Sequence, residues 1–113
     1  MPYINVRMTA PLTPEKESAL TAAFGRDIEA FPGKTERWLM VDYTGDCHMH
    51  FAGGDDPCAM VQISLFGKGN PASFDKMTDL VCRTMEEICG IAPDRCYVKY
   101  EESIHWGWNG QNF

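Results

Sequence analysis

The sequence predicts an α/β (α+β) fold in which two strand–helix–strand repeats form one four-stranded mixed sheet with two helices on one face. Four segments alternate apolar and polar residues, and two intervening segments carry apolar residues at helical spacing. Proline and arginine landmarks recur in the same order: Pro2 with Pro57, Pro14 with Pro71 and Arg37 with Arg95. At 113 residues the chain is of single-domain size, so we expect one domain over residues 1–113, with repeat halves at about 2–56 and 57–113.

The first repeat begins with an alternating segment, Pro2–Met8, which predicts a strand. Thr13-Pro14-Glu15 is typical of a helix start, because it places a hydroxyl cap before a proline and an acidic residue. We expect this helix to end near Phe31-Pro32-Gly33. Arg37–Tyr43 then predicts a second strand, and Asp46–Phe51 a short additional one.

The second repeat follows the same order. Cys58–Phe66 is rich in strand-forming residues, Asn70-Pro71 opens a helix, and Gly90 predicts its end. Arg95–Tyr100 predicts the last strand. Each strand–helix–strand unit favours a right-handed crossover between parallel strands.

Two helices on one face would leave the other face of the sheet open. The strand segments carry the apolar residues Ile63, Leu65, Trp38 and Met40, which predicts apolar side chains on both faces. An uncovered apolar face is an association surface, so we expect an oligomer.

The composition excludes several classes of partner. A formal net charge of −6 argues against nucleic acid, which would require a basic face. The longest apolar run, within Cys58–Ile63, is far too short for a membrane span, and we expect no signal peptide before the Pro2–Met8 strand. Five cysteines without a regular framework favour reduced thiols and a cytoplasmic location.

Several segments, in this order and over essentially the whole chain, resemble the macrophage migration inhibitory factor family of the tautomerase superfamily. They are Met1-Pro2-Tyr3-Ile4, Gly33-Lys34, Phe51–Ala59, Phe66-Gly67-Lys68, Pro93–Tyr97 and Gly107-Trp108-Asn109. The resemblance implies a homotrimer with active sites at subunit boundaries. It also implies an isomerase, a keto–enol tautomerase acting on phenylpyruvate-like small aromatic keto acids, with no cofactor.

A different class of function stays open. Animal relatives act as cytokines, so the chain is alternatively a cytokine-like binding protein with a vestigial pocket. Its partner would then be a host receptor, reached by release through a non-classical route. Dehalogenation or decarboxylation, other reactions of the superfamily, would require an arginine pair or an acidic water activator that we do not find near Pro2.

Pro2 is the candidate catalytic base. A small second residue permits removal of Met1, which leaves a secondary amine at the chain end. An ordinary α-amino group has a pKa of about 8, and burial or a nearby cation lowers that value toward neutrality. The alternative is that Pro2 only begins an edge strand, where its missing N–H does no harm.

The resemblance assigns the substrate-binding residues. It implies that Lys34 and the backbone N–H of Phe66 bind the substrate carboxylate, and that Tyr97 of a neighbouring subunit hydrogen-bonds the substrate carbonyl oxygen. Lys34 is otherwise a solvated residue at a helix end, and Tyr97 a core or interface tyrosine. Lys99 replaces an asparagine of animal members and either adds a cation at the pocket mouth or points to solvent.

An aromatic pocket is also expected. Trp106 stands where family members often carry a small aliphatic residue, and with Trp38, Trp108 and Phe113 it suggests a pocket for a flat substrate.

Metal and disulfide chemistry lack their motifs. Cys47, His48 and His50 have no second ligand cluster, so we expect no metal site. Cys58 lacks the second cysteine of the CxxC motif found in some animal members.

Overall fold

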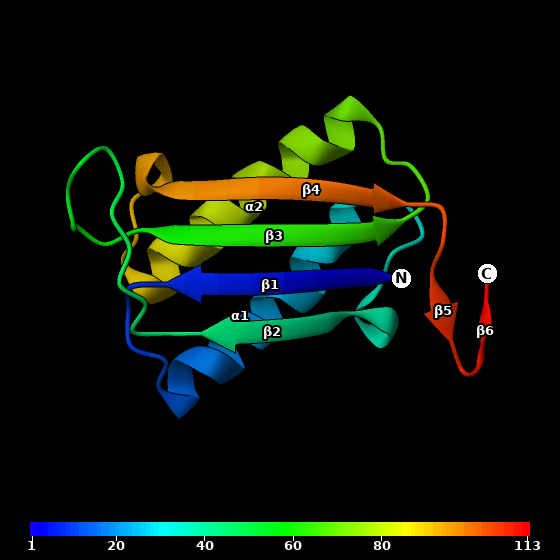
Figure 1. Cartoon of the computed structure of the whole chain (residues 1–113), viewed down its shortest axis with the longest axis horizontal. Helices are drawn as coiled ribbons and strands as arrows, with labels where there is room; N and C mark the ends of the chain where they lie inside the picture. The colour runs from blue at the N-terminus through cyan, green and yellow to red at the C-terminus, as the bar shows by residue number, and fades with distance from the viewer.

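A four-stranded mixed sheet with two helices across one face forms the body of the protein in the computed structural model, which describes residues 1–113 (Figure 1). The strands are β1 (Pro2–Met8), β2 (Met40–Thr44), β3 (Ala59–Phe66) and β4 (Cys96–Ser103), in the spatial order β2-β1-β3-β4. β1 pairs parallel with β2, and β3 parallel with β4, whereas β1 and β3 are antiparallel. The predicted fold class of two strand–helix–strand repeats is confirmed.

Both helices begin where their capping residues predict, and the second also ends at its predicted cap. In α1 (Pro14–Asp27), the Thr13 hydroxyl accepts a hydrogen bond from the backbone N–H of Lys16 at 3.2 Å. In α2 (Pro71–Cys89), the Asn70 side chain accepts one from the N–H of Ser73 at 2.9 Å, and Gly90 ends the helix at φ 68°. Such caps satisfy N–H groups that have no partner within the helix. A 3₁₀ turn, η1 (Ile28–Ala30), extends α1 toward the predicted stop.

Several predicted boundaries are wrong. Residues Glu36–Trp38 form a 3₁₀ turn, η2, so the second strand begins only at Met40 and Trp38 lies outside the sheet. Another 3₁₀ turn, η3 (Pro93–Arg95), precedes β4, which in turn runs past Tyr100 to Ser103.

The predicted strand over Asp46–Phe51 does not form. Asp46 has a left-handed φ of 53°. Its N–H bonds to the carbonyl of Ala10 and that of Cys47 to the carbonyl of Met8, at the end of β1, and no regular strand pairing continues from there. Only an isolated bridge joins Phe51 to Gly54. The segment is therefore a loop that leads from β2 back to the start of β3.

The hydrophobic core lies between the helices and one face of the sheet. Alternate residues of β1 and β3 point into it, including Ile4, Val6, Ile63 and Leu65, each at most 1% exposed. Ile63 and Leu65 therefore lie on the face that the helices cover. The prediction that they contribute to an apolar open face is wrong.

The open face of the sheet is mainly polar. The strand register places three rows of side chains on it: Met40, Tyr3, Ser64 and Glu101; Asp42, Asn5, Gln62 and Lys99; Thr44, Arg7, Met60 and Tyr97. Met40, at 67% exposed, and Tyr97, at 62%, are its large exposed hydrophobic side chains. Both edge strands, β2 and β4, lack an outer strand neighbour within the chain.

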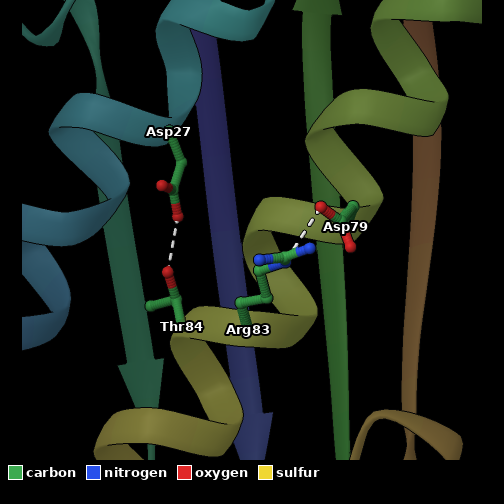
Figure 2. A network of polar contacts seen from close by, with 4 residues as sticks. All are labelled: Asp27, Asp79, Arg83 and Thr84. Carbon is green, nitrogen blue, oxygen red and sulfur yellow. Dashed lines mark hydrogen bonds and ion pairs between the residues drawn. The ribbon is translucent and has the colours of Figure 1, made fainter.

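A buried carboxyl group joins the two helices (Figure 2). The hydroxyl of Thr84 on α2 donates to the carboxylate of Asp27 at 2.7 Å, and Asp27 is only 8% exposed. Burial, the largest influence, raises the pKa of Asp27 above its ordinary value, although the Thr84 hydrogen bond opposes this. The nearby ion pair between Arg83 and Asp79, at 3.0 Å, is exposed and contributes little to stability.

Candidate active site at the chain N-terminus

The chain begins at the end of the sheet where β3 and β4 finish (Figure 1). Pro2 is buried and lies opposite Leu65 in the antiparallel register of β1 and β3. The backbone N–H of Phe66 donates to the Met1 carbonyl oxygen at 3.0 Å. This hydrogen bond extends the ladder by one residue and fixes the chain end against the last residue of β3.

The α-amino group at this chain end is perturbed. Its pKa is lowered from 8.0 to about 6, first by burial and then by the positive charge of Lys34. The Lys34 ammonium donates to the Phe66 carbonyl oxygen at 2.9 Å. A turn through Gly33, at φ 80°, leads from η1 to Lys34. A cation and an amine are therefore held at the same end of β3.

A large open cleft lies beside the amine. Its volume is about 1170 Å³, and its walls include Met1, Pro2, Trp38, Trp106 and Trp108. Lys34 and Phe66 line a second, separate hollow of about 250 Å³.

Aromatic side chains gather at the cleft. The Trp38 and Trp108 rings meet edge to face with centroids 5.0 Å apart, and Trp108 stacks with Phe113 at 6.4 Å. Phe113 also contacts Phe66, at 5.3 Å between centroids. The structure thus brings three of the four predicted aromatic residues into one cluster with Phe66, and Trp106 lines the same cleft.

A C-terminal hairpin, which the sequence interpretation missed, positions this cluster. It consists of β5 (Gly107–Trp108) and β6 (Gln111–Asn112). The hairpin lies outside the sheet, at the end of the sheet where the chain begins (Figure 1). Its turn residues Asn109 and Gly110 have φ values of 52° and 86°. An Asn-Gly pair is a strong hairpin signal, so the sequence did contain the information.

Tyr97 and Lys99 lie away from Pro2 within one chain. Tyr97 pairs with Met60 on β3, whereas Pro2 pairs with Leu65, so five residues, about 16 Å, separate them along the sheet. Lys99 lies two residues closer and forms an exposed ion pair with Glu101 at 3.7 Å. One chain therefore does not bring either side chain to the amine.

Tyr97 is instead part of a cluster at the opposite end of the sheet. The centroid of its ring lies 4.7 Å from that of Phe51, and the guanidinium carbon of Arg95 lies 5.0 Å from the centroid of the same Phe51 ring. Arg95 also donates to the carbonyl oxygens of Phe51 and Asp56, each at 2.8 Å. Arg95 thus fixes the 51–57 loop against the start of β4.

Polar cleft residues were also missed. Arg37, Asp42, Glu101 and Glu102 line the cleft together with the aromatic residues. Their proximity depends on the pairing of β1 with both β2 and β3, which local sequence patterns do not specify. No group of three or more His, Cys, Asp or Glu side chains is placed to hold a metal ion, and Cys47, His48 and His50 form none.

Comparison with known proteins gives the family. The family model described as macrophage migration inhibitory factor (MIF) matches residues 1–113. Macrophage migration inhibitory factor of Mus musculus is 30% identical, over 100% of this chain and 99% of its own length. The chain therefore belongs to the macrophage migration inhibitory factor family.

Solved structures agree with this assignment. The crystal structure of Leishmania major MIF2 is 31% identical, with a TM-score of 0.93 over 100% of this chain and 97% of its own. The homologue from Prochlorococcus marinus is 27% identical, with a TM-score of 0.83 and 98% of each chain covered. No helix of the protein has the length and apolar character needed to cross a membrane.

Proposed function

We propose that the protein is a keto–enol tautomerase that uses the amine of Pro2 as a general base on small aromatic keto acids. The observation that carries the proposal is the chain-end amine, whose pKa is lowered to about 6 beside an aromatic cleft. A base with a pKa near the working pH combines a large free-base fraction with useful proton affinity.

Removal of Met1 would transfer the free amine to Pro2. Pro2 is more buried than Met1, so the main cause of the lowered pKa persists at the new chain end. The same cleavage would take away the Met1 carbonyl oxygen and leave the Phe66 N–H without its acceptor. Phe66 is half-buried, and its freed N–H would then be able to donate to a substrate carboxylate.

The groups around this position suit a keto acid. Lys34 and the Phe66 N–H would bind the carboxylate, while Trp38, Trp106, Trp108 and Phe113 would contact the ring. The amine of Pro2 would then move a proton between the carbon next to the carbonyl group and the carbonyl oxygen, so that atoms and charge balance. No cofactor is needed for this proton transfer.

A homotrimer would complete the site. The cleft of about 1170 Å³ exceeds what one small aromatic acid fills, and Tyr97 and Lys99 are exposed side chains on the open face. In a trimer paired through β2 and β4, Tyr97 of a neighbouring chain would donate to the substrate oxygen, and Lys99 would add a cation. Light scattering of a stable monomer at micromolar concentration would contradict this part of the proposal.

The decisive experiment modifies the chain end. Pro2→Gly keeps a free amine but makes it primary, and an Ala inserted between Met1 and Pro2 converts the proline nitrogen to an amide. We expect both variants to lose about 10²- to 10⁴-fold in kcat/KM for phenylpyruvate enol while the fold persists. A fully active insertion variant, with the added Ala verified by intact mass, would show that another group is the base.

The same mass measurement separates the alternative function. Mature protein that retains Met1 has no proline amine, and a cytokine-like binding role would then be the function left to test.

A further inference from the structure

Arg37 is an exposed cation on the wall of the cleft, in the η2 turn just before β2. Its guanidinium carbon lies 5.1 Å from the centroid of the Trp38 ring. Cation–π contact of this kind holds the planar guanidinium over the aromatic wall while its N–H groups stay free to donate.

The carboxylates of the same cleft are already engaged. Asp42 accepts a hydrogen bond from the Tyr3 hydroxyl at 2.9 Å, and Glu102 accepts one from the Gly69 N–H at 2.8 Å. Glu101 lies 3.7 Å from the Lys99 ammonium.

Arg37 has no such partner. The two ion pairs of the chain are Arg83 with Asp79 and Lys99 with Glu101, and neither includes Arg37. Arg37 is therefore the charged side chain of the cleft that lacks a polar partner. An unpaired guanidinium on an aromatic wall is suited to bidentate binding of an anion.

Arg37 and Lys34 lie on one short segment. Arg37 follows Lys34 by three positions, so their Cα atoms are at most about 11 Å apart. Trp38 follows Arg37 directly and faces Trp108, so an aromatic ring in the cleft would lie near both. Met1 lines the cleft and is hydrogen-bonded to Phe66, which lines the hollow of Lys34. A ligand whose keto-acid carboxylate takes the place of the Met1 carbonyl near Lys34 would direct the far end of its ring into the cleft, toward the guanidinium.

We propose that Arg37 determines specificity by binding a second anionic group on the far end of the substrate's ring. The preferred substrates are then aromatic keto acids that carry a ring carboxylate or similar anion. This inference rests on the proposed tautomerase function, and it adds a substrate class to it.

The experiment compares two substrates that differ only in the ring anion. The enol forms of phenylpyruvate and 4-carboxyphenylpyruvate are assayed with wild type and with Arg37→Gln. A charge-assisted hydrogen bond predicts a KM about 10- to 100-fold lower for the carboxylated substrate with wild type. Arg37→Gln removes that preference, whereas the control Lys76→Gln, on the helix layer, removes equal charge and keeps the preference.

A parallel binding titration keeps the two proposals distinguishable. Cinnamate and 4-carboxycinnamate are titrated calorimetrically, because they present the same anions on a flat ring without requiring turnover. Failure to convert phenylpyruvate would refute the tautomerase, whereas tighter binding of the dicarboxylate, lost in Arg37→Gln, would still support Arg37. Equal affinity of wild type for both ligands, or equal weakening of both by Arg37→Gln, would overturn the specificity role.

Discussion

The charge of Lys34 can be removed while most of its side-chain volume is kept, by the substitution Lys34→Met. Burial is the larger cause of the lowered amine pKa and Lys34 the second, so the pKa should rise from about 6 only part of the way toward 8.0. A pKa of 6 leaves about 90% of the amine unprotonated at pH 7, and a pKa of 8 about 9%. The loss of free base at pH 7 is therefore below about tenfold. Loss of the carboxylate contact should raise KM separately, by about 10- to 100-fold.

The assay is kcat/KM for phenylpyruvate enol between pH 4.5 and 9. A catalytic base works unprotonated, so activity rises with pH, and the midpoint of that rise should move upward in the variant. Lys68→Met is the matched control, because Lys68 lines the same hollow as Lys34 but does not contribute to the amine pKa. An unmoved midpoint together with an unchanged KM would refute the role of Lys34 in both tasks.

Three further predictions concern the groups that hold the fold and the site in place. Burial raises the pKa of Asp27 above 3.8, so the folded chain holds this proton more tightly than the unfolded chain, and stability falls as pH rises through that window. Asp27→Asn should flatten this fall in urea denaturation between pH 4 and 7, and an unaltered slope would contradict it. The lysine of Arg95→Lys cannot reach all the carbonyl oxygens that Arg95 bonds in the 51–57 loop. The backbone amides of this loop should therefore exchange hydrogen faster, and the free energy of unfolding should fall by about 1–3 kcal/mol; unchanged exchange would argue against the role of Arg95 in fixing the loop. Gly110→Ala places a side chain at φ 86° and should cost about 1 kcal/mol in the hairpin, with a higher KM for phenylpyruvate; an unchanged KM would separate the hairpin from the site.

The predictable part of the fold is the part encoded by local patterns. Alternation in Pro2–Met8 and the caps at Thr13 and Asn70 define elements that need only their own neighbours. The parallel pairing of each repeat followed from helix length and connection rules. The boundaries of the second strand did not, because Trp38 has strand propensity but packs against Trp108 of a distant hairpin.

The candidate site was predictable only where the family resemblance extended. That resemblance named Pro2 and Lys34, which the structure places at one end of β3. The cleft charges Asp42 and Glu101 come from different strands, and only the sheet order makes them neighbours. The open face was misjudged because alternation reveals two faces but not which one the helices will cover.

The antiparallel pairing of β1 with β3 relates the two repeats by an approximate two-fold axis, so the start of β1 corresponds to the start of β3. Pro2 is the first residue of β1, and Pro57, its counterpart in the second repeat, lies just before β3. The nitrogen of Pro57 is an amide in mid-chain and cannot accept a proton at neutral pH. Chemistry that depends on a terminal amine is therefore possible at the start of β1 and not at the start of β3. The start of β3 carries no such requirement. Beside it, Arg95 holds the 51–57 loop in place and Tyr97 is exposed. A circular permutant that starts at Pro57 would give Pro57 a terminal secondary amine and make the nitrogen of Pro2 a mid-chain amide.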